Sequence, residues 1–368
     1  MLCRKIEVTS FRNIAHADVA FCDGINVLCG ENAQGKTNLL EAIYYAAIGK
    51  SFRGQSNGEL IRFGDPFAVL SLSYFGKGRE QNITARLLSS KARTLEKNKV
   101  SIRRVSDLVG EFRAVLFSPE HLSLIKDGPA ERRQFLDIAG RGSEALYLRS
   151  LQRYNQILKQ RNALLKKAAD DPRIFAETGD VWSAQLAKEA AVIAAYRHRY
   201  VGKAETYVKE CFAEMTGTRE VPELKYLGVA KEETELYNDP AALEETVLRK
   251  LTGNTAREIA AGATLWGIHK DDVEIELNGK SARSYCSQGQ QRSLALALKM
   301  AEGEICREDC GEYPVFLFDD VLSELDSARR EYLLQKIRGR QVILTTCERE
   351  SAPAGRRIFV KNGVFSEG

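Results

Sequence analysis

GENAQGKTNLLEAI, residues 30–43, is the stretch that decides the fold of this 368-residue chain. It matches a phosphate-binding loop, in which Gly30 is followed after four residues by Gly35, Lys36 and Thr37. The glycines let backbone N–H groups turn inward around phosphates, the lysine supplies positive charge, and the threonine hydroxyl can ligate Mg²⁺. The residues that we expect to bind a nucleotide triphosphate are Gly30, Glu31, Asn32, Ala33, Gln34, Gly35, Lys36, Thr37 and Asn38.

The sequence on both sides of the loop agrees with this interpretation. Residues 25–29, INVLC, are typical of a buried strand, and residues 38–48 carry apolar side chains at helical spacing. A helix that begins there directs the positive end of its dipole at the phosphates. A chance glycine-rich turn is the alternative, and it does not require a strand before the loop and a helix after it.

Length and composition restrict the remaining possibilities. A chain of 368 residues is too long for one typical core, so we expect two domains or one domain with a large insertion. No apolar run approaches ~18 residues, so no membrane span is predicted. The start, MLCRKIEVTSF, lacks the apolar region of a signal peptide, and the eight cysteines have irregular spacing, so we expect a cytoplasmic protein with reduced thiols.

The net charge of +4 conceals two strongly basic segments. Residues 76–104 contain nine basic and two acidic residues, and residues 145–167 contain six basic residues and no acidic one. Such concentration of charge indicates a polyanionic partner, although two solvated surfaces explain it equally well. The candidates for contact with DNA are Lys91, Arg93, Lys97, Arg149, Arg153 and Arg161.

The pattern of secondary structure changes twice along the chain. Short strands dominate up to about residue 130, long helices follow to about residue 262, and strand character returns at residues 272–277 before an Asn278-Gly279 hairpin turn. We therefore predict a nucleotide-binding domain split by a helical insertion, with its N-terminal part at 1–130, a helical arm at 131–262 and its C-terminal part at 263–368. Within the arm, Asp170-Asp171-Pro172 ends the first long helix, a second begins near Val181, and a third has Asp239 as its cap.

The second half of the nucleotide site is predicted at PVFLFDD, residues 314–320. A buried parallel strand delivers its last residues to the edge of the sheet beside the phosphate loop. We expect Asp319 to ligate Mg²⁺ together with Thr37, and Asp320 to orient the attacking water or take its proton. Lys36, Asp319 and Asp320 are thus the predicted catalytic residues. Acidic residues that merely cap the next turn are the alternative.

A further motif, SQGQQR at residues 287–292, heads a long apolar helix. Its first four residues, Ser287, Gln288, Gly289 and Gln290, can form a second anion site at a helix N-terminus. One chain has little use for two triphosphate readers in one pocket, so we expect this helix to contact a phosphate held by another subunit. The alternative is an ordinary capped helix.

These motifs together resemble known families. Residues 287–290 resemble the signature motif of ABC-type ATPase heads, and SELD at 323–326 resembles their D-loop. SFRN at 10–13 is similar to the start of SMC-like heads, which makes Arg12 a further candidate for nucleotide binding. With LFSPEHL, AERRQFLD, YCSQGQQRSLALALKMAE and FLFDDVLSELD, the chain resembles the RecF family of bacterial DNA replication and repair proteins over nearly its whole length.

The resemblance implies an α/β fold, namely an ABC-type ATPase head with a P-loop core, an antiparallel β subdomain and an inserted α-helical arm. It also implies an ATP-dependent DNA-binding protein of recombinational repair and replication-fork maintenance, in the context of the SOS response. Such proteins bind single- and double-stranded DNA and form homodimers on ATP. They hydrolyse ATP slowly to reset the dimer, and they act with RecO and RecR to help RecA reach gapped DNA.

The chain departs from the family pattern in two places. Residues 267–272 read GIHKDD where GPHRDD is usual, and Lys270 cannot form the bidentate contacts of an arginine. Residues 345–347 read TTC, with Cys347 where a third threonine is commoner.

Three other functions are compatible with part of the sequence. An ATPase subunit of an ABC transporter would share the motifs, but a basic helical insertion suits a membrane partner poorly. A P-loop kinase or GTPase would lack the SQGQ helix. A DNA clamp with a vestigial loop would not need Lys36, Thr37, Asp319 and Asp320 together.

Overall fold

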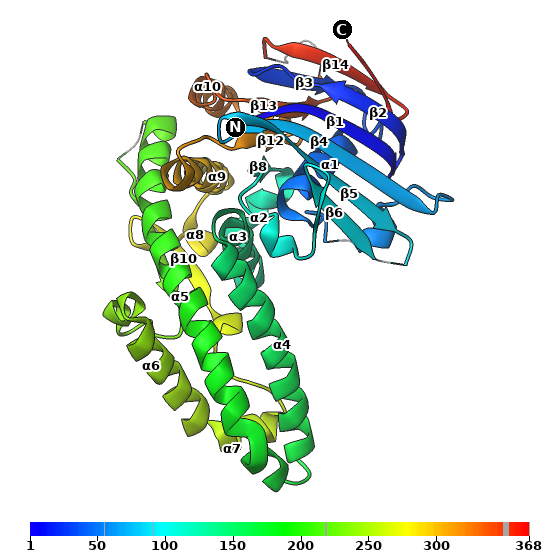
Figure 1. Ribbon diagram of the computed structural model, residues 1–368. Helices are drawn as coiled ribbons and strands as arrows, with labels where there is room; N and C mark the ends of the chain where they lie inside the picture. The colour runs from blue at the N-terminus through cyan, green and yellow to red at the C-terminus, as the bar shows by residue number, and fades with distance from the viewer. Residues whose placement is uncertain (55, 91, 218, 349–352, 368) are drawn as a thin grey trace. The chain divides into compact units, whose positions relative to one another are not determined.

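The computed structural model describes residues 1–367 apart from 55, 91, 218 and 349–352, and the chain divides into two compact units (Figure 1). The first unit comprises Met1–Ser123, Tyr207–Arg219 and Ser287–Gly368, and the second comprises Leu124–Thr206 and Glu220–Cys286. Residues 263–286, expected in the C-terminal part of the head, belong to the second unit. They do so because β10 (Asp272–Leu277) pairs along its whole length with β9 (Pro222–Leu227), which lies in the same unit.

A six-stranded, mainly parallel sheet forms the first layer of the first unit. Its order is β15 (Val364–Glu367), β14 (Arg356–Lys361), β3 (Ile25–Cys29), β13 (Val342–Thr346), β12 (Val315–Phe318) and β8 (Ala114–Phe117). Only the pairing of β15 with β14 is antiparallel. Strand β12 is a continuous apolar run, and β13 is buried at every residue, as is typical of parallel strands that are covered on both faces. The predicted strands at 25–29 and 315–318 are confirmed residue for residue.

A second, antiparallel sheet completes the first unit. Its order is β2 (Ile14–Ala20), β1 (Leu2–Phe11), β4 (Phe67–Gly76), β5 (Arg79–Leu88), β6 (Arg93–Lys97) and β7 (Val100–Ile102). Helix α1 (Lys36–Ile48) packs against strands of both sheets (Figure 1). It is buried on nearly every side, which explains why its sequence is apolar all round rather than along one stripe.

Two further helices of the first unit begin at predicted motifs, α9 (Gln288–Cys310) at SQGQ and α10 (Ser327–Lys336) after SELD, whose Asp326 is its N-cap. Helix α9 is buried from Ser293 to Cys306, and α10 follows β12. Within α9, Glu304 accepts a hydrogen bond from Arg340 at 2.7 Å, so the one long helix is tied to the loop before β13. This contact anchors the C-terminal half of α9, whereas the SQGQ motif lies at its N-terminal end.

The second unit is mainly helical. It contains α3 (Pro129–Ser143), α4 (Ala145–Ala168), most of α5 (Arg173–Thr216), α6 (Pro240–Gly253), α7 (Thr255–Ala261) and α8 (Ala282–Tyr285), with α2 (Ser123–Lys126) at its start. The small sheet β11 (Lys280–Ser281), β10 and β9 lies in the same unit. Helices α4 and α5 run side by side, and ion pairs and hydrogen bonds link them at several levels (Figure 1).

Local signals in the second unit are confirmed except at one boundary. Asn278 and Gly279 both have positive φ, 54° and 71°, in the turn between β10 and β11, and the Asp239 carboxylate caps α6. Helix α5 was expected near Val181 but begins at Arg173, because the Asp171 carboxylate accepts the Arg173 N–H at 3.1 Å. Gly179 lies inside this helix, and the position suits glycine because a Cβ there would lie 2.3 Å from the Phe175 ring.

Short 3₁₀ helices occupy Asn57–Leu60, Val105–Asp107, Pro119–Leu122, Thr234–Asn238, Ile268–Lys270 and Leu322–Glu324. Within the described part of the chain, no helix combines the length and the apolar character needed to cross a membrane.

Candidate nucleotide-binding site

The phosphate loop joins the end of β3 to the start of α1, as predicted. Gly30 has no room for a side chain, since a Cβ would lie 2.4 Å from the Val360 carbonyl oxygen. Gly35 has φ 116°, a conformation that favours glycine, and it precedes α1 without a side-chain cap. The first N–H groups of α1 therefore remain available to an anion.

Lys36 is the main positive charge inside the loop. Its side chain is 5% exposed, and its ammonium donates to the carbonyls of Gly30 at 2.6 Å and Glu31 at 2.8 Å. It also lies 3.3 Å from the Cys347 Sγ. No ion pair in the described part of the chain includes Lys36. A buried ammonium without a carboxylate neighbour favours an anionic ligand strongly, because burial is otherwise costly for a charge.

The turn between β14 and β15 holds the loop in place. The Gly363 N–H donates to the Gln34 carbonyl at 2.8 Å, and the Asn362 N–H donates to the Gln34 side chain at 2.6 Å. Asn13, in the predicted SFRN motif, donates to the Ala33 carbonyl at 3.1 Å. Sequence reasoning missed the role of the Asn362-Gly363 turn. The dipeptide is a hairpin signal, but nothing in it indicates which loop the hairpin meets.

Thr37 and Asp319 join the two halves of the site. The Thr37 hydroxyl donates to the Asp319 carboxylate at 2.7 Å, and the Thr345 hydroxyl donates to the same oxygen at 2.9 Å. Burial raises the pKa of Asp319, and the two hydroxyl bonds oppose that rise. Hard oxygen donors of this kind suit Mg²⁺, so the arrangement fits the metal that the sequence predicts here. Thr345 is a partner that the sequence analysis did not identify.

Asp320 adopts an unusual backbone conformation directly after β12. Its φ is 53°, in the left-handed region that non-glycine residues rarely occupy. Its N–H donates to the Thr345 hydroxyl at 2.9 Å, and its carbonyl accepts from the Ser323 hydroxyl at 2.7 Å. These bonds hold a strained residue beside Asp319, and strain of this kind is concentrated at functional sites.

Ser287 caps α9 in the manner that the sequence suggests. Its N–H donates to the Gln290 side chain at 2.7 Å, and its hydroxyl accepts from the Gln290 N–H at 3.3 Å. Ser287 and Gln288 are exposed, and a Cβ at Gly289 would lie 3.2 Å from Arg329. The geometry is that of a capping box with an exposed face. It is compatible with anion binding and equally with an ordinary capped helix.

Similarity to known proteins shows which family this chain belongs to. The family model of the RecF/RecN/SMC N terminal domain matches residues 2–362. A DNA replication and repair protein RecF from Clostridium novyi (strain NT) is 37% identical over 346 residues, which are 94% of this chain and 92% of that relative. The chain belongs to the RecF family. A RecF from Shouchella clausii (strain KSM-K16) is 38% identical, again over 94% of this chain and 92% of the relative.

Solved structures agree with this family. The recombination mediator protein RecF of the RecFOR pathway, solved as RecF–ATPrS, has a TM-score of 0.94 and 32% identity and covers 100% of this chain and 98% of that one. Its RecF–ATP counterpart has a TM-score of 0.91 and 31% identity, covering 100% and 97%. An Smc head domain from Pyrococcus furiosus has a TM-score of 0.56 at 17% identity, covering 100% and 96%, a likeness of fold alone. The predicted fold class, an ABC-type ATPase head with a helical arm, is confirmed.

Arg12, which the SMC-like start suggested for nucleotide binding, points to a carboxylate of α1. Its guanidinium donates to Glu41 at 2.9 and 3.0 Å and to the Glu59 carbonyl at 3.1 Å. Glu41 is fully buried and also accepts the Ser51 hydroxyl at 2.5 Å. Arg12 thus supports α1 from the side in this RecF-family chain, and its contact with a nucleotide stays a prediction.

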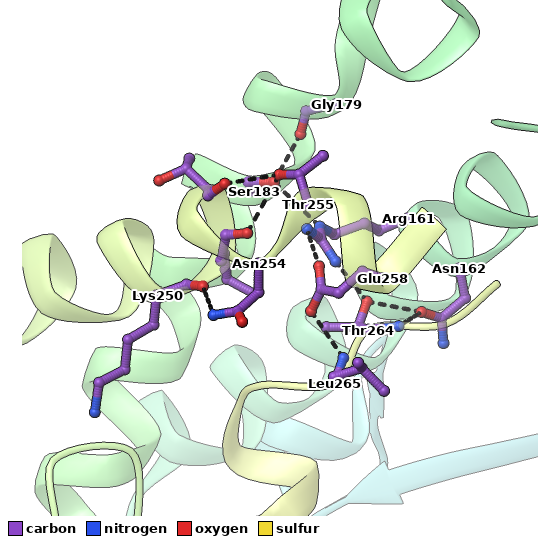
Figure 2. A network of polar contacts seen from close by, with 12 residues as sticks. Arg161, Asn162, Gly179, Ser183, Lys250, Asn254, Thr255, Glu258, Thr264 and Leu265 are labelled. Atoms are coloured by element: carbon purple, nitrogen blue, oxygen red, sulfur yellow. Dashed lines mark hydrogen bonds and ion pairs between the residues drawn. The ribbon is translucent and has the colours of Figure 1, made fainter. Parts of the chain in front are cut away.

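The position of Arg161 contradicts the prediction that it contacts DNA. Its side chain is fully buried and forms an ion pair with Glu258 at 2.6 Å (Figure 2). It donates to the hydroxyls of Ser183 at 3.1 Å and Thr264 at 2.8 Å, and its guanidinium lies over the Phe175 ring. A side chain enclosed in this way cannot reach a DNA phosphate, so the predicted DNA contact of Arg161 is wrong.

The other basic candidates differ in their surroundings. Arg149 and Arg153 are exposed on α4, and Arg153 lies 3.5 Å from Glu189. Lys97 pairs with Glu111, and Arg93 donates to Tyr45 at 3.1 Å and also contacts the Gly49 carbonyl, so both also serve the structure of the first unit. Lys91 lies outside the described residues. Among the described candidates, Arg149 and Arg153 are therefore the ones with exposed side chains.

The two residues that depart from the RecF pattern, Lys270 and Cys347, lie in different surroundings. Lys270 is exposed, whereas Asp271 is buried and accepts from Arg197 at 2.7 Å. His269 is hydrogen-bonded to Tyr154 at 2.7 Å, and burial lowers the pKa of its imidazole. Cys347 donates to the Asn32 side chain at 2.9 Å beside Lys36, so this departure lies within the phosphate loop's surroundings.

Proposed function

We propose that this RecF-type DNA repair ATPase is an ATP-driven DNA clamp, in which two chains close on ATP, bind single- and double-stranded DNA, and separate after slow hydrolysis. The observation that carries the proposal is the 2.7 Å bond between Thr37 and Asp319, which brings the phosphate loop and the second acidic strand into one site. Relatives named as DNA replication and repair proteins, and neighbours solved as RecF–ATP and RecF–ATPrS, support ATP as the substrate.

Each residue has a distinct part in this mechanism. Lys36 and the first N–H groups of α1 hold the phosphates, while Thr37 and Asp319 hold Mg²⁺. When bound, Mg²⁺ neutralises charge that develops on the phosphate oxygens. The Asp320 carboxylate orients the attacking water and accepts its proton. Ser287 of the partner subunit donates to the γ-phosphate from the start of its α9, so hydrolysis requires the closed dimer.

We infer the partners of this chain from its family. The RecFOR pathway named for the solved relatives supports joint action with RecO and RecR, which assists RecA at gaps. The exposed Arg149 and Arg153 support contact with DNA backbones. We infer recognition without sequence specificity, because phosphate contacts position a protein but do not read bases.

Sedimentation with and without ATP, in the presence and absence of DNA, tests the proposal. We expect a dimer only with ATP and Mg²⁺, and DNA bound by that dimer. A chain that dimerises on ATP but ignores DNA would instead support the ATPase subunit of a transporter. A chain that stays monomeric with ATP would contradict the clamp.

Two variants examine the composite site directly. Ser287→Arg should bind ATP but neither dimerise nor hydrolyse it, and mixing it with Lys36→Ala chains should restore one working site and part of the activity. Demonstrated heterodimers without any recovery would count against the contact in trans. Asp320→Asn should bind ATP and Mg²⁺ and accumulate as a dimer, and hydrolysis at the wild-type rate would exclude the proposed role of Asp320.

A further inference from the structure

A groove on the second unit contains an aromatic ring among cations. It has a volume of about 720 Å³ and lies between α4 and α5. Its lining includes Trp182, which is half-buried, and the exposed cations Arg153, Lys159 and Lys188. The three glutamines Gln156, Gln160 and Gln185 complete most of its polar wall.

The groove carries more positive than negative side chains. Its acidic lining residue, Glu189, is buried and already lies 3.5 Å from Arg153. Lys159 and Lys188 stand on opposite helices, so the groove is positive along both walls. The lining accordingly favours an anionic occupant, because Lys159 and Lys188 stay positive when Glu189 is paired with Arg153.

The indole ring of Trp182 indicates which kind of anion fits the groove. An indole face between cations can stack on an unpaired base while the cations contact the flanking phosphates, and amide side chains can bond to base edges. A duplex offers no free base face, because its bases are already stacked on one another. An acidic peptide would use the cations but would gain little from the indole.

We propose that the α4–α5 groove binds single-stranded DNA, with one unpaired base stacked on Trp182 and neighbouring phosphates held by Arg153, Lys159 and Lys188. The inference rests on the proposed function, because it assigns the single-stranded part of the DNA to a defined site.

Intrinsic fluorescence gives a direct test, since the chain has two tryptophans. Trp266 is 39% exposed and lies under Lys250, so Trp266→Phe is a mild change that leaves Trp182 as the sole reporter. In this background oligothymidylate should quench the emission with a saturable curve. Poly-glutamate of similar charge should not. Saturable quenching by poly-glutamate with none by oligothymidylate would overturn the proposal in favour of an acidic peptide.

Binding of single strands and duplexes by the full chain, in ATP and Mg²⁺, completes the test. Trp182→Ala should weaken single-strand binding by about 5- to 100-fold, Trp182→Phe far less, and both should leave duplex binding within about twofold. Lys159→Glu with Lys188→Glu should reduce the salt dependence of single-strand binding, while the exposed control Lys167→Glu at the end of α4 should not.

Two failures are distinguishable. If the duplex binds normally and Trp182→Ala binds single strands as tightly as the wild type, the groove proposal is wrong and the proposed clamp survives. If the wild-type chain binds neither form of DNA, the proposed function itself fails, and the groove proposal fails with it.

Discussion

Lys36 and Arg161 are both buried cations, but their surroundings differ in one decisive respect. Arg161 has the Glu258 carboxylate at 2.6 Å, whereas the Lys36 ammonium contacts two carbonyl oxygens and a thiol. The first charge is neutralised inside the protein. Among the described residues no carboxylate pairs with the second, which is held in place by dipoles that do not neutralise it. Burial of a cation therefore indicates a ligand site only where the fold does not supply the counter-charge.

The comparison also separates two kinds of arginine within the basic segment 145–167. Arg153 and Arg161 lie two helical turns apart on α4, yet Arg153 is 68% exposed on its side chain and Arg161 is fully buried. Charge counts along the sequence treat the two alike. The helical spacing distinguishes them, because Arg161 lies four residues from both Ile157 and Leu165 on the buried face of α4, and the structure adds Glu258 of α7 as its partner.

The largest effect is expected from removing the counter-charge of Arg161. Glu258→Ala should lower the free energy of unfolding by about 3–5 kcal/mol, because an unpaired guanidinium stays buried among Ser183, Thr264 and Phe175. Urea denaturation followed by circular dichroism measures this change.

Glu144→Ala is the matched control for that measurement. Its partner Arg199 lies 2.6 Å away in an exposed pair, so the loss should stay below about 1 kcal/mol. Equal costs for Glu258→Ala and Glu144→Ala would remove the distinction drawn here between buried and exposed ion pairs.

Removing the other buried cation should affect binding rather than folding. Lys36→Ala should weaken ATP binding by about 2–5 kcal/mol, since the phosphates lose their buried positive partner, and it should abolish ATP-driven dimerisation. Isothermal titration calorimetry measures the affinity and urea denaturation the stability. A variant that unfolds far more readily but binds ATP normally would show that Lys36 is a structural cation like Arg161.

The same contrast explains how much of this molecule the sequence predicts. The phosphate loop, the strand at 315–318 and the caps at Asp239 and Ser287 follow from residues that are neighbours in the chain. The support of the loop by the Asn362-Gly363 turn does not, because strand order in the sheet brings β14 beside β3. Likewise Thr345 reaches Asp319 only because β13 lies next to β12. Local motifs were predictable, as was the meeting of Thr37 with Asp319 that two of those motifs imply, whereas contacts that depend on strand order alone were not.

A second buried ion pair of the second unit, between Asp271 and Arg197, should make the free energy of unfolding depend on pH. Burial raises the pKa of Asp271 from 3.8 to about 6, against the opposing effect of Arg197. Between these values the folded chain binds a proton that the unfolded chain does not, so this group stabilises the fold increasingly as pH falls from 6 towards 4. The gain is at most about 3 kcal/mol.

The difference between wild type and Asp271→Asn isolates this group. His269, whose pKa is lowered by burial, acts in the opposite direction, but it is present in both proteins and cancels. The wild-type chain should gain stability relative to Asp271→Asn as pH falls through 6, measured by urea denaturation at each pH. A difference that is flat with pH would place the Asp271 pKa near its ordinary value.

The smallest effect is expected at Ser287, where one hydroxyl serves two purposes. Within the chain it caps α9 by accepting the Gln290 N–H at 3.3 Å, so Ser287→Ala should cost about 1 kcal/mol of stability. In the proposed closed dimer the same hydroxyl donates to a phosphate, so ATP-driven dimerisation should weaken by a further 0.5–1.5 kcal/mol, or about 2- to 10-fold.

Asp239→Ala is the matched control, because it removes the cap of α6 in the second unit, where no nucleotide is proposed. That control should lose similar stability in urea and dimerise on ATP like the wild type in sedimentation. If Ser287→Ala matches Asp239→Ala in both measurements, Ser287 is a helix cap and nothing more, and the open face of α9 does not read a phosphate.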